Sequence, residues 1–377
     1  MKKKKKVKLK LKKSVVNVLK IIGAFCALFL IVYFIYAKQI STFTKLNYSK
    51  AASKEILFSG NKDFVLSVGE NATLNAAFES DVYKDKYLKN YSKIDFYDHK
   101  NLIKNINTLI GKGYSNNDIS VILAHGDDEE VTKFAKRERI KYLEEFYQYD
   151  YAILSNYDRY LAYTDATGED EKTTVIHVNL DMDKERYVDV VEVPNFSYDM
   201  LVNKYRYLDK NYEPDDLIRI KDEYTDGEEY FANRTAVNAL IQMFETAKLD
   251  GLEMVVNSAY RSYEEQEDTA EFYRKWYGDN YVTNFVAKPG FSEHQTGLSF
   301  DIGSTSEKVF ADSKEYEWVR KNAHKYGFIL RFTKKGEVIT GFRSEPWHIR
   351  YVGKDIAKYV YEHNITFEEY YVMFLDK

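Results

Sequence analysis

The most strongly patterned hydrophobic stretch of the chain lies near its N-terminus. Residues 21–37, from Ile21 to Ala37, include no charged side chain, whereas nine of the first thirteen residues are lysine. At ~1.5 Å of rise per residue this stretch can cross ~30 Å of hydrocarbon as a tilted helix, with Lys20 reaching back to the membrane surface. The lysine excess predicts a cytoplasmic basic tail at 1–20 and an exported remainder of the chain.

A cleaved signal peptide is the competing interpretation of this stretch. The apolar segment is longer than a usual signal core, and it ends in Ile35-Tyr36-Ala37, where a small residue is expected at the first position. We therefore expect an uncleaved transmembrane anchor at 21–37. The single cysteine, Cys26, lies inside this anchor, so disulfides within one chain and cysteine-rich zinc sites are excluded.

Beyond the anchor the pattern weakens and then becomes helical. Residues 38–99 are interpreted as a stalk and a poorly defined segment, in which the short alternation from Phe64 to Val68 predicts a strand. From residue 100 onward apolar residues recur at helical spacing, with a break at 111–113, a new helix from Ser115 and a further helix over 133–149. We expect 100–194 to be a mostly helical accessory module that spaces the next domain from the membrane.

The last part of the chain has a different pattern. All four prolines follow residue 193, which favours a domain boundary near 194 and a final domain at 195–377. In that domain the pattern predicts helices over 233–247 and 263–277 and a strand over 252–257. Short helices and strands alternate irregularly, which indicates an α+β domain and not repeated βαβ units.

Charge is distributed very unevenly along the chain. The formal net charge is −4, but ten of the 55 basic residues lie in residues 1–20, so the rest of the chain carries 45 basic and 59 acidic side chains. Binding to nucleic acid requires clustered lysine and arginine. The acidic exported part therefore excludes nucleic acid as a partner, and the basic tail is assigned to the membrane.

Reactive side chains concentrate in three segments of the final domain: SAYRS at 258–262 followed by Gln266, SEHQTGLSFD at 292–301, and EPWH at 345–348. Two imidazoles and a carboxylate, from His294, His348 and Asp301, suit a catalytic zinc ion, which takes three protein ligands and keeps an open position. Glu345 supplies a carboxylate that could accept a proton. The alternative is a set of structural, hydrogen-bonded histidines, which the residues alone leave open.

The spacing of the third segment imposes a geometric condition. Glu345 precedes His348 by three positions, and Pro346 biases Glu345 toward an extended conformation. Residues three apart on an ideal strand face opposite ways. The backbone must therefore bend if Glu345 and His348 both point into one site.

The segments SAYRSYEEQ, SEHQTGLSFDIG and EPWHIRYVG closely resemble the signature motifs of VanY-type D-Ala-D-Ala carboxypeptidases and the related LD-carboxypeptidases, and the resemblance covers about residues 195–377. It implies a zinc-peptidase domain of the hedgehog/DD-peptidase type, with a small antiparallel sheet and flanking helices. It also implies that His294, Asp301 and His348 bind Zn²⁺ and that Glu345 is the general base.

The same resemblance implies roles for four further residues. Arg261 and Gln266 are expected to contact substrate, with Arg261 near the terminal carboxylate or the developing oxyanion, and Ser292 and Trp347 are expected to line the cleft. Phe332 departs from the family, which often has tyrosine there. The implied function is removal of the C-terminal D-alanine from peptidoglycan stem peptides, outside the cytoplasmic membrane.

The sequence leaves three alternative functions open. An LD-carboxypeptidase would act on tetrapeptide stems, an endopeptidase would cut cross-links in a cleft open at both ends, and a non-catalytic zinc-containing protein would only bind the cell wall. The presence of Glu345 argues against the last, because a binding protein has no need of a proton acceptor beside the metal.

Overall fold

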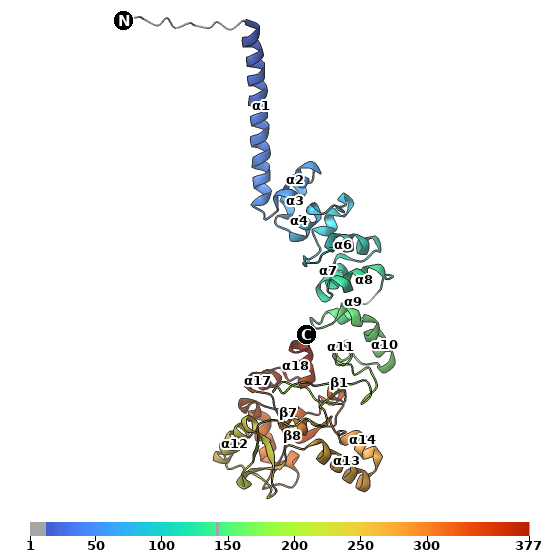
Figure 1. The fold of residues 1–377 in the computed structure, drawn as a ribbon, viewed down its shortest axis with the longest axis vertical. Coiled ribbons are helices and arrows are strands. Elements are labelled where there is room, and N and C mark those ends of the chain that lie inside the picture. Colours follow the sequence, from blue (N-terminus) through green and yellow to red (C-terminus); the bar gives the residue numbers. More distant parts are fainter. Residues whose placement is uncertain (1–12, 141–142, 377) are drawn as a thin grey trace, which may run out of the picture. The chain divides into compact units, whose positions relative to one another are not determined.

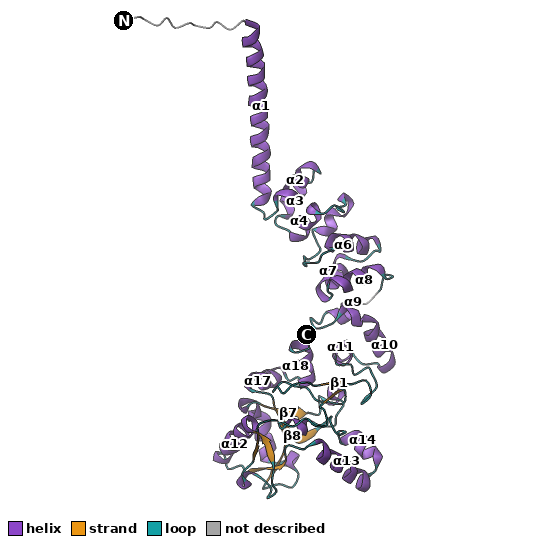
Figure 2. Ribbon diagram, viewed as in Figure 1, coloured by secondary structure: helices purple, strands orange, loops and turns teal. Residues whose placement is uncertain are grey.

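The computed structural model describes residues 13–140 and 143–376, and its contacts divide the chain into two compact units, 1–144 and 145–377. Within the described residues every strand belongs to the second unit, where Figure 2 shows the strands in orange. The first unit is helical. This arrangement confirms the predicted α+β class with a helical segment ahead of the sheet.

Helix α1 (Lys13–Thr44) contains the predicted anchor and is the long blue helix of Figure 1. Its segment Val15–Thr44 is, among the described residues, the one helix long and apolar enough to cross a membrane, and none of its most apolar window is buried. A 30-residue helix at ~1.5 Å per residue exceeds the ~30 Å thickness of the hydrocarbon core. The length therefore leaves room for tilt or for a segment outside the bilayer.

The rest of the first unit consists of short helices. Helix α6 ends at Gly111 as predicted, and α7 begins after Ser115, which forms a capping box with Asp118. The helical elements described between α1 and the end of this unit are α2 (Lys50–Phe58), α3 (Lys62–Val68), α4 (Ala72–Glu79), η1 (Asp85–Tyr87), α5 (Leu88–Tyr91), α6 (Leu102–Gly111), α7 (Asn116–His125) and α8 (Asp128–Lys136).

The strand predicted between Phe64 and Val68 is wrong, because this segment lies in helix α3. Phe64, Val65 and Val68 fit the helical spacing i, i+1, i+4 as well as they fit a short alternation. Gly69, with φ of +83°, ends the helix. A five-residue window does not distinguish the two periods.

The single helix predicted over Lys133–Tyr149 is also wrong. Helix α8 ends at Lys136 and α9 covers Leu143–Tyr147, with residues 141–142 of the predicted helix outside the described residues. Tertiary hydrogen bonds replace helical ones in the segment after α8. The amide of Ile140 donates to the Tyr114 hydroxyl (3.0 Å), and Lys112 Nζ donates to the Arg137 carbonyl.

The second unit opens with α-helical elements and continues into the sheet. Its helices are η2 (Leu154–Asn156), α10 (Tyr157–Thr167), α11 (Glu171–Asn179), η3 (Asp222–Tyr224), α12 (Arg234–Leu249), α13 (Tyr263–Tyr277), α14 (Asp279–Phe285), η4 (Glu293–Thr296), η5 (Phe310–Asp312), α15 (Lys314–Asn322), η6 (Ala323–Tyr326), α16 (Glu337–Thr340), α17 (Lys354–His363) and α18 (Phe367–Phe374). Helices α12 and α13 confirm the predicted 233–247 and 263–277. The functional boundary near 194 stays a prediction, since α10 and α11 belong to the same compact unit as the sheet.

The main sheet has four antiparallel strands in the order β5-β6-β8-β7. These strands are β5 (Met254–Ser258), β6 (Ser299–Ser304), β7 (Phe328–Phe332) and β8 (Glu345–Tyr351), and β5 confirms the strand predicted over 252–257. Two small two-stranded sheets pair β1 (Val191–Glu192) with β2 (Arg206–Tyr207) and β3 (Leu217–Arg219) with β4 (Phe231–Asn233).

Apolar side chains bury the sheet from both faces. Phe300, Phe328 and Ile349 belong to one core cluster that also contains Leu240 of α12. Ile329 belongs to a second cluster built with residues of α11, α17 and α18. Because successive residues of a strand point to opposite faces, Phe328 and Ile329 pack into different clusters. The strands that carry the reactive residues are therefore held rigidly.

Candidate metal centre and substrate pocket

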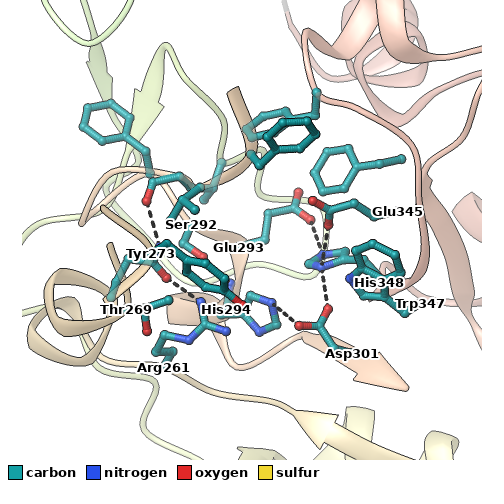
Figure 3. A pocket seen from close by; sticks show the side chains of 18 of the residues that line it. Arg261, Thr269, Tyr273, Ser292, Glu293, His294, Asp301, Glu345, Trp347 and His348 are labelled. Carbon is teal, nitrogen blue, oxygen red and sulfur yellow. Dashed lines mark hydrogen bonds and ion pairs between the residues drawn. The ribbon is translucent and has the colours of Figure 1, made fainter. Parts of the chain in front are cut away.

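His348 and Asp301 meet because the sheet places them directly opposite each other. They are register partners on the neighbouring antiparallel strands β8 and β6. Side chains paired in this way have Cβ atoms about 4.5–5.5 Å apart. The Nδ1 atom of His348 lies 3.0 Å from Oδ1 of Asp301. Figure 3 marks this contact with a dashed line.

A bulge in β8 satisfies the geometric condition on Glu345. Leu330 pairs with Ile349 but Phe332 pairs with Glu345, so β8 uses four positions where β7 uses two. Extra residues in one strand bend it and re-aim side chains. Oε2 of Glu345 consequently lies 3.8 Å from Nδ1 of His348, on the same side as the imidazole (Figure 3).

His294 reaches the same point from the turn η4, which precedes β6. The chain reverses at Gly297 (φ +67°), where an added Cβ would approach Leu217 Cδ2 to 3.0 Å and the Asn233 amide nitrogen to 3.3 Å. Glycine is therefore required both by the left-handed conformation and by the lack of space. With the turn fixed, Nε2 of His294 lies 3.5 Å from Oδ2 of Asp301.

In each imidazole one ring nitrogen faces Asp301 and the other faces a second acceptor. Nδ1 of His294 contacts the Ala259 carbonyl oxygen at 2.6 Å, and because a carbonyl only accepts, Nδ1 carries the hydrogen and Nε2 is the acceptor. Nε2 of His348 is buried without a hydrogen bond within 3.5 Å and lies 3.6 Å from the Glu293 carboxylate. With a metal ion in the site, the Glu293 carboxylate would keep the hydrogen on Nε2, and Nδ1 would be the atom that binds the ion.

The three side chains fit a tetrahedrally coordinated cation. Their ligand atoms all lie within 4.8 Å of one another. Metal–ligand bonds of ~2.0–2.2 Å in a tetrahedral site separate neighbouring ligand atoms by roughly 3.4 Å. The separations of 3.0 and 3.5 Å to the two Asp301 oxygens lie on either side of this value. His294, Asp301 and His348 therefore form a possible metal site.

The electrostatics of the centre favour a cation. Burial raises the pKa of Asp301, but the neighbouring His294 and His348 outweigh it and hold that pKa below its ordinary value. Burial also opposes charge on His348, yet the neighbouring carboxylates of Asp301 and Glu293 raise its pKa to about 9. The surroundings thus stabilise positive charge at this imidazole, which a metal ion would supply in place of a proton.

The pKa of the Glu345 carboxyl is raised, whereas that of the Asp301 carboxyl is lowered. Burial raises its pKa to about 7, and the carboxylates of Asp301 and Glu293 add to this effect, although His348 opposes it. A pKa near neutrality lets a carboxylate both accept and return a proton.

A buried ion network lies behind the centre. Arg331, which is 1% exposed, donates from Nε to Glu293 (2.8 Å) and from both terminal nitrogens to Glu368 of α18 (2.8 and 2.6 Å). Arg350 lies 3.3 Å from Glu293. Burial would raise the pKa of Glu293, but Arg331 and Arg350 outweigh it and lower that pKa. Glu293 is therefore a fixed anion behind His348.

The predicted substrate residues all line one pocket beside this centre, with a volume of about 320 Å³. Arg261 donates to Gln266 Oε1 (2.7 Å) and to Ser258 Oγ (2.9 Å). Gln266 is 2% exposed and donates in turn to the Ala287 carbonyl, so it holds Arg261 in place. Ser292 is buried and caps η4, whereas Trp347 is 42% exposed at the rim.

Sequence reasoning missed several residues of this pocket. Thr269, Tyr273, Tyr281 and Phe285 line it from α13 and α14, and Glu293 lies at its floor (Figure 3 labels Thr269, Tyr273 and Glu293). Glu293 stands inside one of the motifs, but its role depends on Arg331, 38 positions away. Tyrosines stand at 273, 277 and 281, and this four-residue spacing could have indicated a helix face directed toward the pocket.

Part of the chain is similar in sequence to known peptidases. Residues 230–354 match the family model described as VanY, D-alanyl-D-alanine carboxypeptidase. A Bacillus subtilis protein named "Putative carboxypeptidase YodJ" is 41% identical over 179 residues, 45% of this chain and 66% of that protein. The solved LdcB LD-carboxypeptidase is 42% identical, with a TM-score of 0.43, over 45% of this chain and 84% of its own.

An Enterococcus gallinarum protein, the bifunctional D-Ala-D-Ala dipeptidase and D-Ala-D-Ala carboxypeptidase VanXYC, is 34% identical, and the match covers 45% of this chain and 92% of that protein. The chain spans between about half and two thirds of the length of the first curated relatives it matches. Nearly all of VanXYC is thus matched by less than half of this chain. The chain belongs to the VanY family of D-alanyl-D-alanine carboxypeptidases.

Proposed function

We propose that this protein is a zinc-dependent carboxypeptidase that removes the C-terminal D-alanine from peptidoglycan stem peptides. The observation that carries the proposal is the convergence of His294, Asp301 and His348 beside Glu345, in a pocket that also holds Arg261. Membership of the VanY family and the names of the enterococcal relatives support the choice of substrate.

His294, Asp301 and His348 would hold the zinc ion. Zinc in such a site supplies Lewis-acid activation of water and of the scissile carbonyl. The chain's own contribution is to keep two imidazoles in the tautomers that face the ion, through the Ala259 carbonyl and the Glu293 carboxylate.

Glu345 would act as general base and then as general acid. Its carboxylate accepts a proton from the attacking water and returns it to the amine of the leaving D-alanine. Its position 3.8 Å from His348 Nδ1 puts it next to the metal-binding atoms, and its pKa of about 7 suits both steps.

Arg261 would recognise the free carboxylate of the stem peptide. Its guanidinium has five N–H donors, and the bonds to Gln266 and Ser258 leave others for a ligand. The planar guanidinium matches a carboxylate through two parallel bonds, which lysine cannot reproduce. Gln266 serves as a positioning residue, Ser292 holds η4 and Trp347 covers the rim.

We also propose that α1 anchors the protein in the cytoplasmic membrane as a single span. The lysines of residues 1–20 would stay in the cytoplasm, and the acidic remainder would lie outside, where its substrate is found. In this arrangement residues 195–377 are the catalytic domain, and 100–194 separate it from the bilayer.

The proposal is tested by mass spectrometry of purified muropeptides incubated with the full-length protein, with and without a chelator. Pentapeptide stems should lose one alanine in the presence of zinc, and the chelator or Glu345→Gln should prevent the loss. Loss of alanine from tetrapeptide stems alone would establish the LD-carboxypeptidase alternative. Intact stems of both kinds would overturn the proposal.

A further inference from the structure

Aromatic rings form a continuous ladder along helices α13 and α14. The rings of Tyr277 and Tyr281 stack at 4.8 Å with an interplanar angle of 28°, and those of Tyr281 and Phe285 stack at 4.8 Å and 29°. Tyr273 stacks on Tyr281 at 5.6 Å and 24°. The spacing of 273, 277, 281 and 285 continues across Gly278, which separates the two helices.

Two further rings extend the ladder over the outer surface of α13. Phe272 packs edge-on against Tyr273 at 5.6 Å, and Trp276 lies 6.3 Å from Phe272. The ladder is thus defined by Phe272, Tyr273, Trp276, Tyr277, Tyr281 and Phe285.

One end of the ladder is part of the substrate pocket. Tyr273, Tyr281 and Phe285 line it together with Glu345 and Trp347. A molecule bound in the pocket can therefore continue onto the ladder without leaving an aromatic surface.

The other end of the ladder is open to solvent. Phe272, Trp276 and Tyr277 are 57%, 65% and 61% exposed. The ladder residues of α13 contribute little to the hydrophobic core, since the residues described as buried in this helix are Gln266 and Ala270, which are not part of the ladder. Large aromatic side chains held on the surface next to a pocket indicate a binding surface, because exposing them in isolation has a cost in free energy.

The charge around the ladder restricts what can bind there. Residues 263–285 contain six acidic side chains and two basic ones. Such a surface repels anionic lipid headgroups and anionic polymers. It suits a neutral ligand with C–H groups, because the faces of aromatic rings are electronegative and attract them.

We infer that the ladder binds the glycan strand that carries the stem peptide, with sugar rings stacked on Trp276 and Tyr277 while the peptide end lies in the pocket. The inference rests on the proposed function and narrows it to polymeric, glycan-linked substrate. A pyranose ring presents a face of C–H bonds to an aromatic ring and its hydroxyls to water. Stacking of a neutral sugar thus suits a surface that is aromatic, exposed and flanked by acidic side chains.

The test uses the full-length zinc-loaded protein, its Trp276→Ala/Tyr277→Ala variant and a Trp276→Phe/Tyr277→Phe variant that keeps the rings. Binding is measured to glycan strands from which an amidase has removed the peptides and whose freed lactyl carboxyl groups have been converted to methylamides, so that the probe is neutral. The alanine variant should bind at least about tenfold more weakly than wild type, and the phenylalanine variant should bind nearly as well. Tyr361→Ala, an exposed ring (46%) on α17 outside the ladder, is the matched control and should not change binding.

Two kinetic measurements complete the test. For glycan-linked pentapeptide, kcat/KM should fall about tenfold in the alanine variant, whereas for the free diacetylated tripeptide ending in D-Ala-D-Ala it should stay within about twofold. Equal losses on both substrates, or unchanged strand binding, would overturn the inference. If wild type hydrolyses neither substrate, the proposed function fails, while binding to the bare strands still decides whether the ladder is a glycan surface.

Discussion

The two sides of the substrate pocket are built on opposite principles. On the sheet side, His294 and His348 are 5% and 4% exposed, and a buried ion network lies behind them. On the helical side, α13 and α14 present half-exposed rings held mainly by one another. The proposed metal ligands would need positions fixed to within fractions of an ångström, whereas stacking of a ligand on flat rings would tolerate sliding.

This difference predicts that substitutions on the two sides of the pocket should have different effects on activity. Changes on the sheet side should abolish chemistry or stability for every substrate, since they alter the metal, the base or their support. Changes on the helical side should act on some substrates and not on others.

Removal of the metal should have the largest effect. A chelator, or His348→Ala, should reduce hydrolysis of free tripeptide and glycan-linked peptide alike to background, because the residues at 294, 301 and 348 act as one site. Zinc content by elemental mass spectrometry should fall with activity and return with added Zn²⁺ only in the chelated wild type. His324→Ala, which lies outside the triad, should retain both.

Glu345→Gln should separate the base from the metal. Glutamine keeps the shape of the side chain but cannot accept a proton, so kcat should fall by about 10²–10⁴-fold on both substrates. Zinc content should remain at the wild-type level. Activity close to wild type in this variant would show that another group takes the proton, and Glu264→Gln on the exposed surface controls for charge.

Arg331→Met should reduce stability by about 3–5 kcal/mol, because it leaves Glu293 and Glu368 buried without their common partner. Thermal unfolding of the zinc-loaded protein measures the effect. The matched control is Arg320→Met, since the Arg320–Glu317 pair on α15 is half exposed and such pairs contribute about 0–1 kcal/mol. Equal losses in the two variants would mean that the network is not a support for the centre.

Arg261→Ala should have the smallest effect of the four. Loss of a charged hydrogen-bonding group should lower kcat/KM for a free carboxylate by about 10–100-fold, with little change for the corresponding amide. The ratio of the two rates is the measurement, and Arg234→Ala on the surface of α12 is the control. An unchanged ratio would remove Arg261 from carboxylate recognition.

The sequence was most informative where function depends on a few reactive side chains. His294, Asp301 and His348 stand in compact motifs, and the structure brings them together because β6 and β8 are neighbours in the sheet. The need for a bend at Glu345 was predictable from residue spacing, and the bulge in β8 meets it. The buried ion network behind these motifs was not predictable, because nothing in the sequence around Arg331 or Glu368 indicates which side chains they pair with.

Prediction was weakest in the N-terminal unit. The segment Phe64–Val68 is too short to separate helical from strand periodicity, and only Val65 within α3 is buried. The break after Lys136 depends on hydrogen bonds to Tyr114 and Lys112, which are far away in sequence. In both cases tertiary contacts decide the local structure, and a single sequence does not encode them visibly.

The bond between Arg331 and Glu368 has a consequence for the order in which the protein matures. Glu368 is synthesised after all three metal ligands, and until it arrives Arg331 lacks one of its two carboxylate partners. A growing chain that ends before α18 thus holds Glu293 and His348 less firmly. For a zinc enzyme of the kind we propose, tight capture of the ion, and with it hydrolytic competence, should be deferred until translation has passed the last helix.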